Sequence, residues 1–499
     1  MRRVWVRELT GWIGALGVSV LIAGQVAASA RSELLFRDGD SLIVAMFARS
    51  VLAGGPQDWA MSSVLFLPES TVFAGLDALF PLDVNALLAV GAVVNLLALY
   101  GALRLAAGRR RDGRAPVAWS LIGLGAFGIV AATETSASRD ALELASLQLT
   151  TTYYAATVVG VVLSIGLVRR VCDRERGGGG LLCALAAVAT VSTLTNPLFA
   201  VWATVPLTVV ILIDIVGSTR KAISLITLAM LVGGTALGFL GRIPFEAWIA
   251  NTGAGYAQPD QWSQSVGYYG GLLADRLSTP LGVVGCLLTL VLLGWAVLRT
   301  VRAADAGSRL VATFAWLAPV LVVVGAIALG THAARYLQPL AFAPVLALVA
   351  SPRALRMPSA VARVAVAVAA VLVLVGGAVS VPRLTAAAEA PDPDLVCVTD
   401  WVNASGRTGA GQFWTVRLPK LHLADPSQLV QVDHQLNGYA WLVNRRDFDV
   451  GEVSFLVEDA QTVQWQLPTA AIPEDVVECG RYRILDFGDT TLSLGPQRS

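Results

Sequence analysis

Three carboxylates in the segment that follows the first apolar run are the residues best suited to chemistry. Asp38 and Asp40 flank a single glycine, and Glu69 follows about thirty residues later. Two acids one residue apart repel each other unless a partner or ligand lies nearby. They could serve as a general base or as metal-contacting acids. The alternative is that Asp38 and Asp40 begin a short amphipathic helix over 41–52, and that Glu69 begins another helix.

A second group of candidates lies in the loop that contains Glu134, Arg139, Asp140 and Glu143. Mutual ion pairing at the surface is the simpler interpretation, and a contribution of Glu134 to a substrate site is the alternative.

Aromatic side chains are concentrated between residues 241 and 279. They are Trp248, Tyr256, Trp262, Tyr268 and Tyr269. Such residues form belts at the headgroup level of membranes. The alternative is that these residues form a wall for a sugar or polyprenyl chain. Tyr256 is the one that we expect to bind substrate, and Trp59 of the first loop is a further candidate for substrate binding.

The short loop over 331–339 carries His332, Arg335 and Tyr336. The guanidinium of Arg335 could bind a phosphate in a bidentate manner. Anchoring to lipid headgroups is the alternative for this loop.

The cysteines predict a disulfide but no metal centre. Cys397 and Cys479 bracket the C-terminal region, and we expect them to pair in an oxidising compartment. Cys172, Cys183 and Cys286 lie in or near apolar segments. No Cys-x-x-Cys spacing occurs, and no nucleotide-binding glycine motif occurs either.

The composition indicates a membrane protein that must position these residues with apolar helices. The chain has 499 residues, 55% of them hydrophobic and only 14% charged, against about 25% charged in ordinary soluble domains. The net charge of +1 gives no indication of a nucleic-acid partner. Eleven segments are long and apolar enough for us to predict spans. They are 11–30, 84–104, 115–133, 149–168, 181–195, 197–216, 222–240, 280–298, 310–329, 338–350 and 362–381. At Asn196-Pro197 the apolar pattern breaks, so the segments on either side are either two helices joined by a tight turn or one kinked helix.

Arginine-rich loops alternate with loops that contain few cations. The basic loops hold Arg109, Arg110, Arg111 and Arg114; Arg169, Arg170, Arg174 and Arg176; Arg220 and Lys221; Arg299, Arg302 and Arg309; and Arg353, Arg356 and Arg363. By the positive-inside rule, these loops and the N-terminus are cytoplasmic. The loops 31–83 and 241–279 and the region 382–499 are then extracytoplasmic. The spans contain almost no ionisable residues, which weakens an ion-coupled transporter interpretation.

The organisation that we predict is a transmembrane domain over 1–381 followed by an extracytoplasmic domain over 382–499. Alternating runs in the second domain indicate an α/β or β-rich fold. The runs are 429–432, 440–443, 453–457, 463–467 and 482–487. No catalytic constellation is evident there, so we expect a binding or positioning role. The fold class is therefore an all-α polytopic membrane protein with an additional mixed or strand-rich domain.

The pattern resembles the GT-C class of integral membrane glycosyltransferases, including relatives of dolichyl-phosphate-mannose–protein mannosyltransferases. Asp38-Gly39-Asp40 stands where that class has its catalytic acid, and Leu67-Pro68-Glu69 where it has a second acid. Arg335-Tyr336-Leu337-Gln338-Pro339 is similar to an Arg-Tyr-x-x-Pro stretch that follows a late span in some members.

The resemblance implies transfer of a hexosyl or pentosyl group, with inversion, from a polyprenyl-phosphate donor to a glycan or lipid acceptor of the cell envelope. Asp40 would be the base, Asp38 and Glu69 would shape the site, and Arg335 would bind phosphate. A divalent cation, Mg²⁺ or Mn²⁺, is left open as a cofactor. We expect the protein in a bacterial cytoplasmic membrane, in contact with membrane lipid. Two other classes stay open: a non-enzymatic transporter of lipid-linked glycans or envelope assembly protein, and a ligase that transfers whole glycans.

Overall fold

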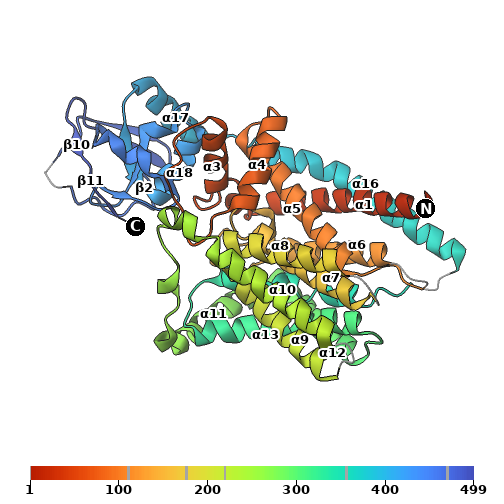
Figure 1. The fold of residues 1–499 in the computed structure, drawn as a ribbon. Coiled ribbons are helices and arrows are strands. Elements are labelled where there is room, and N and C mark those ends of the chain that lie inside the picture. The colour runs from red at the N-terminus through yellow and green to blue at the C-terminus, as the bar shows by residue number, and fades with distance from the viewer. Residues whose placement is uncertain are drawn as a thin grey trace. The chain divides into compact units, whose positions relative to one another are not determined.

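The computed structural model describes residues 2–109, 113–174, 178–217, 221–354, 358–467 and 471–498. Arg110, Arg111, Arg176, Arg220 and Arg356 of the basic loops lie outside the described residues. The chain divides into two compact units. Unit 1 contains residues 1–35, 88–243 and 254–388, and unit 2 contains residues 36–87, 244–253 and 389–499. Figure 1 labels their elements along the chain.

Unit 1 is built from apolar helices. They are α1 (Arg2–Ala27), α5 (Val84–Ala106), α6 (Pro116–Ala132), α7 (Ala155–Cys172), α8 (Gly179–Thr195), α9 (Val205–Gly217), α10 (Lys221–Leu240), α11 (Trp262–Leu277), α12 (Pro280–Val301), α13 (Ala306–Ala328), α14 (Pro339–Phe342), α15 (Leu346–Ala350) and α16 (Ser359–Ala388). The helices α8 and α10 pack together, as do α1 with α16 and α12 with α13. A Cβ at Gly234 would lie 2.5 Å from the carbonyl oxygen of Ala186. The glycine therefore allows the backbones of α10 and α8 to approach closely.

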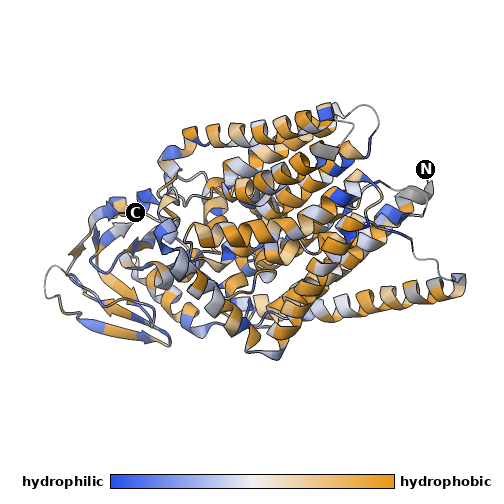
Figure 2. Ribbon diagram, turned by 90° about the horizontal axis from the view of Figure 1, so that it is seen from below, coloured by the Kyte–Doolittle hydropathy of each residue, from blue (hydrophilic) through white to orange (hydrophobic). Residues whose placement is uncertain are grey.

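Seven helices in the described ranges are long and apolar enough to cross a membrane. They cover Trp5–Ala27, Val84–Ala106, Ala155–Cys172, Lys221–Leu240, Pro280–Val301, Ala306–Ala328 and Val366–Ala388. Figure 2 shows apolar residues, in orange, along the long helices of the structure. Many lie on exposed faces, such as Leu290 at 62% and Val291 at 66% exposure on α12. Apolar surface of this extent on helices of this length is typical of a multi-pass membrane protein.

The remaining predicted spans are shorter or interrupted, so the prediction of eleven spans is not confirmed. The helices α6 and α8 have 17 residues each. Asn196 is extended and ends α8, so the break at Asn196-Pro197 separates two helices. A π-helical turn, η2 (Ala200–Thr204), precedes α9. The predicted span over 338–350 is divided between α14 and α15.

Ion pairs tie the arginine-rich ends of the helices in unit 1 together. Glu8 at the start of α1 contacts Arg104 near the end of α5 at 2.6 Å. Arg114 before α6 contacts Asp305 before α13 at 2.6 Å. Arg169 near the end of α7 is completely buried and donates to the carbonyl oxygens of Ala106 and Val349. These contacts link the ends of α1, α5, α7 and α13 that carry arginines.

Unit 2 contains a mixed sheet of seven strands. Its order is β11-β4-β3-β2-β7-β9-β8. The strands are β2 (Gly409–Gln412), β3 (Leu429–Val432), β4 (Asn437–Tyr439), β7 (Phe455–Glu458), β8 (Asp475–Cys479), β9 (Tyr482–Asp486) and β11 (Gly495–Arg498). Strands β2, β3 and β7 are parallel. The helix α18 (Phe413–His422) connects β2 to β3 and packs on both strands. This β-α-β connection makes the strand-rich C-terminal region an α/β structure.

The predicted strands of this region agree with the structure in part. The run 429–432 is β3, and the run 482–487 contains β9. The run 453–457 spans parts of β6 (Glu452–Val453) and β7. The predicted strand over 440–443 is wrong for its first three residues, because strand structure resumes only in β5 (Val443–Asn444). The run 463–467 contains no strand.

Residues of the first loop complete unit 2. The loop contains the helices α3 (Ile43–Leu52) and α4 (Leu67–Leu79), which pack together. Its strand β1 (Trp59–Ala60) pairs antiparallel with β5. A disulfide joins Cys397 on α17 (Pro393–Ser405) to Cys479 on β8, as expected from the sequence. The loop thus belongs to the same compact unit as the C-terminal region, a grouping that differs from the division expected at residue 381.

Candidate functional site

The acidic pair of the first loop lies in the turn that leads into α3. Asp38 Oδ2 accepts a hydrogen bond from the backbone N–H of Ser41 at 3.2 Å. The N-cap of α3 is Leu42, which has no capping side chain. Asp38 therefore stabilises the turn before the helix rather than the helix terminus itself. Asp38 and Asp40 are both half-buried, so solvent still reaches this turn.

A buried arginine of α18 lies against the acidic turn. Arg417 is 0% exposed, and its Nε donates to the carbonyl oxygen of Gly39 at 3.2 Å. Burial lowers the pKa of Arg417 to about 10, while Asp40, Asp447 and Asp38 favour the charged form in that order. At neutral pH the side chain is therefore a buried cation beside two carboxylates.

Glu69 occupies the first turn of α4, where a negative charge is favourable. The side chain is buried at 7% exposure. The preceding residues Phe66, with a positive φ of 51°, and Pro68 set the direction of the helix. This position agrees with the interpretation of Glu69 as a helix N-terminal acid.

Trp59 is only 2% exposed in unit 2. Its ring packs edge-on against Phe47 with the centroids 5.4 Å apart. The backbone of Trp59 pairs with Asn444 in the β1–β5 ladder. These contacts give Trp59 a role in packing the first loop within unit 2.

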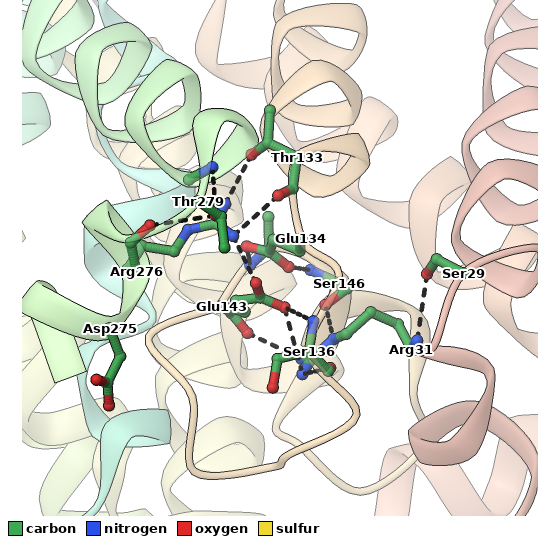
Figure 3. A network of polar contacts seen from close by, with 12 residues as sticks. Ser29, Arg31, Thr133, Glu134, Ser136, Glu143, Ser146, Asp275, Arg276 and Thr279 are labelled. Carbon is green, nitrogen blue, oxygen red and sulfur yellow. Dashed lines mark hydrogen bonds and ion pairs between the residues drawn. The ribbon is translucent and has the colours of Figure 1, made fainter.

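In unit 1, the loop between α6 and α7 is organised around Arg31, which is 1% exposed (Figure 3). Its Nε donates to Ser146 Oγ at 2.8 Å. Its terminal nitrogens donate to the carbonyl oxygens of Ser136, Ser138 and Glu143 at 2.9–3.0 Å. Arg31 therefore uses its planar fork of donors to hold the loop in one conformation.

Arg276 on α11 is the second cation of this network. Its Nη1 donates to Glu143 Oε1 at 2.5 Å and to the carbonyl oxygen of Thr133 at 2.9 Å. Glu143 Oε2 accepts from the backbone N–H of Ser136 at 2.8 Å and lies 3.9 Å from Arg31 Nη1. Glu143 thus lies between two arginines, whereas the sequence suggested ion pairing within its own loop.

Glu134 is buried below the same loop. Its two carboxylate oxygens accept backbone N–H groups from Ala145 and Ser146 at 2.8 and 2.7 Å. Burial raises the pKa of Glu134, and the nearby Arg31 opposes that rise. Both oxygens are occupied by hydrogen-bond donors from the protein, so the arrangement is that of a loop-stabilising carboxylate.

A cavity of about 390 Å³ borders this network within unit 1. Its lining includes the polar residues Ser136, Ser138, Asp140, Asp275 and Thr279. The carboxyl groups of Asp140 and Asp275 are exposed, while Glu143 and Arg276 form its buried side. Hydroxyl and carboxylate groups of this kind can accept and donate hydrogen bonds to a polyhydroxylated molecule.

Arg335 lies in the short 3₁₀ helix η6 (Ala334–Leu337) of unit 1. Its Nε lies 3.2 Å from the hydroxyl oxygen of Tyr154, to which it donates. The guanidinium lies 5.7 Å from the ring centroid of Tyr336. Burial raises the pKa of Tyr336, and the charge of Arg335 opposes this rise. The cation therefore lies beside the phenol of Tyr336, which stays protonated at neutral pH.

Two other predicted residues lie in the same part of unit 1. The imidazole of His332 packs edge-on against Tyr268, with the centroids 5.5 Å apart. Tyr256 lies in the short helix η4 (Ala254–Tyr256) and is 40% exposed.

The predicted site residues thus form two sets, one in each compact unit. Asp38, Asp40, Glu69 and Trp59 belong to unit 2, whereas Glu134, Tyr256, His332, Arg335 and Tyr336 belong to unit 1. Sequence reasoning missed Arg31, Arg276 and Arg417. Arg31 follows one predicted span and Arg276 precedes another, both in loops that contain few other cations, which was an available signal. Arg417 lies between apolar residues of α18, where a charge needs a specific partner.

No protein-family model matches the chain, and no curated protein matches its sequence. Within the described ranges, no group of three or more His, Cys, Asp or Glu side chains is arranged to hold a metal ion. The chemistry of the site is therefore argued from the contacts above.

Proposed function

We propose that the protein is a membrane glycosyltransferase of the GT-C class. It transfers a sugar from a polyprenyl-phosphate donor to an acceptor hydroxyl of the cell envelope, on the extracytoplasmic side of a bacterial cytoplasmic membrane. The observation that carries this proposal is the half-buried acidic turn, Asp38-Gly39-Asp40, fixed against the buried cation of Arg417. A carboxylate that is fixed and still accessible meets the first requirement for a general base.

In the proposed reaction, Asp40 accepts the proton of the acceptor hydroxyl. The acceptor oxygen bonds to the anomeric carbon as the bond from that carbon to the phosphate oxygen breaks, with inversion. The polyprenyl phosphate leaves with the bonding electrons. The charge on the phosphate needs a cation, and a guanidinium matches phosphate oxygens; the resemblance assigns this role to Arg335. Asp38 holds the turn, and Glu69 shapes the loop that follows it.

The amphiphilic donor fits the composition of unit 1. Its helices expose apolar side chains along lengths suited to a bilayer, which favours a substrate that is delivered within the membrane. Arg335 and its surrounding tyrosines offer the cation that a phosphate headgroup requires.

The test is the replacement Asp40→Asn, assayed for sugar transfer in membranes supplied with polyprenyl-phosphate sugars. We expect a loss of about 100-fold or more, the lower range for removal of a general base. The matched control is Asp58→Asn in the same loop, because Asp58 is 48% exposed and pairs with Arg445. Transfer by a folded Asp40→Asn protein at a rate near that of the Asp58→Asn control would remove Asp40 from this role.

A further inference from the structure

Arg417 on α18 is a buried cation with incomplete hydrogen bonding. It is 0% exposed, and the ring centroid of Phe413 lies 5.2 Å from its guanidinium carbon. Its Nε donates to the carbonyl oxygen of Gly39, and its Nη1 donates to that of Leu442. Among the described residues, Nη2 has no hydrogen-bond partner. Arg31 in unit 1, by contrast, donates from Nε, Nη1 and Nη2.

The charge balance of α18 directs Arg417 toward the acidic turn. Lys420, one helical turn further along α18, is also buried and lies 2.9 Å from Asp447. Asp447 therefore balances Lys420 at close range. Asp40 is the carboxylate that favours the charged form of Arg417 most strongly, followed by Asp447 and Asp38. An uncompensated buried charge would be costly, so the cation and the acidic turn require each other.

The backbone of the turn lies directly on α18. A Cβ at Gly39 would come within 3.2 and 3.3 Å of two ring carbons of Trp414 and within 3.4 Å of the Arg417 side chain. Those distances are tighter than ordinary contacts, so the glycine allows the turn to approach the helix. Asp38 closes the turn from the other side by accepting from Ser41.

Further contacts within unit 2 hold the first loop on the C-terminal region. Strand β1 pairs with β5, and Arg445 Nη1 lies 3.2 Å from Asp58 Oδ1. Arg37, the residue before the acidic turn, lies 3.7 Å from Asp392. Contacts therefore hold the chain both before and after the acidic turn, and Arg417 contacts Gly39 at its centre.

We propose that Arg417 is the positioning residue that holds Asp40 in the geometry needed for proton transfer, which makes α18 of the C-terminal region an integral part of the catalytic site. This inference rests on the proposed function. It gives the C-terminal region a definite role: the transmembrane helices and the first loop alone would lack the group that fixes the base.

The experiment uses the full-length protein with the variants Arg417→Gln and Arg417→Lys. The matched control is Arg407→Gln, which removes an ion pair with Asp486 in the same unit. We expect Arg417→Gln to lower kcat by about 100-fold, the effect of a misplaced catalytic group, with KM for the donor within twofold. Arg417→Lys keeps the charge and should recover part of the loss. A folded Arg417→Gln protein with the kcat of the Arg407→Gln control would overturn the proposal.

A second measurement does not depend on activity. Hydrogen exchange in peptides that cover residues 36–44 should accelerate in Arg417→Gln and stay unchanged in Arg407→Gln. Unchanged exchange in Arg417→Gln would overturn the proposed contact. If Arg417→Gln fails to fold, Gly39→Ala retains the cation and shifts the turn. We expect a lower kcat from that variant, and an unchanged kcat would contradict the proposal.

The variant Asp40→Asn separates this inference from the proposed function. Absence of sugar transfer by the wild-type protein would remove the proposed function. Full activity of Asp40→Asn would remove Asp40 as the base, and this inference with it. An inactive Asp40→Asn protein together with a fully active Arg417→Gln protein would remove this inference alone.

Discussion

The clusters around Arg31 in unit 1 and Arg417 in unit 2 both bury arginine among carboxylates. They differ in how many of their nitrogen and oxygen atoms have hydrogen-bond partners. In the first, Arg31 and Arg276 donate to carbonyl, hydroxyl and carboxylate oxygens, and both oxygens of Glu134 are occupied. In the second, Arg417 has a nitrogen without a described partner, and the neighbouring acids are half-buried. The first arrangement stabilises a loop. The second keeps carboxylates accessible, as chemistry requires.

The largest effect on stability should come from breaking the cluster around Arg31 in unit 1. Glu143→Leu leaves Arg31 and Arg276 buried without the carboxylate that lies between them. We expect a loss of about 3–5 kcal/mol in the free energy of unfolding, the usual cost of breaking a buried ion pair. Unfolding in mixed micelles would measure this loss. The control Asp140→Asn changes an exposed acid of the same loop, and equal stability of the two variants would contradict a structural role for the cluster.

The second-largest loss of stability should come from removing the disulfide of unit 2. Replacing Cys397 and Cys479 together by Ser removes a crosslink between residues 82 apart in the chain. We expect unit 2 to lose about 2–4 kcal/mol of stability, mainly because the unfolded chain gains freedom. Thermal unfolding of the wild type with and without reductant provides the comparison. A double variant as stable as the oxidised wild type would show that α17 and β8 are held by packing alone.

A smaller, pH-dependent effect should come from His422 at the end of α18. Burial lowers the pKa of His422 below its ordinary value, and Arg49 lowers it further. The unfolded chain therefore binds a proton near pH 6.5 while the folded chain does not, so stability is lost as the pH falls below about 6.5. The slope approaches about 1.4 kcal/mol per pH unit between the two pKa values. Melting temperatures of His422→Asn between pH 7.5 and 5 should fall less steeply than those of the wild type, and parallel curves would contradict this assignment.

The smallest effect should come from the partly exposed pair of Arg407 and Asp486. The two side chains lie 2.7 Å apart, and Arg407 lowers the pKa of Asp486. The stabilisation from this pair is therefore present above the ordinary carboxyl pKa of about 3.9 and lost as the pH falls below it. Solvent screening limits the contribution to about 0.2–1 kcal/mol. Denaturant unfolding of Arg407→Gln at pH 7 would measure this contribution to the free energy of unfolding. If Arg407→Gln lost as much stability as Glu143→Leu, solvent exposure would not explain the difference between this pair and the buried cluster around Arg31.

The apolar helices were predictable because length and hydropathy alone define them. The starts of α5, α10 and α12 lie at or within one residue of the predicted spans. The central strand β3 was also predicted at its observed bounds, because its apolar run is short and bounded by turn residues. The predicted span over 338–350 failed because Pro339 and Pro344 interrupt a sequence that is otherwise apolar.

The partners of the candidate acids could not be predicted from the sequence. Arg417 is separated from Asp40 by most of the chain, and neither helical nor strand periodicity links such positions. Arg276 and Glu143 are likewise brought together only by the packing of helices from distant segments. Sequence patterns locate charges that need compensation, whereas tertiary structure decides which groups provide it.

Unit 2 is assembled from residues 36–87, 244–253 and 389–499, and this division has a consequence for biosynthesis. The first segment leaves the ribosome long before the strands and helices on which it packs. The turn at Asp38-Gly39-Asp40 therefore gains its hydrogen bond from Arg417 only after α18 has been synthesised. A chain that ends before α18 would leave the first loop without the hydrogen bond from Arg417 and without the pairing of β1 with β5.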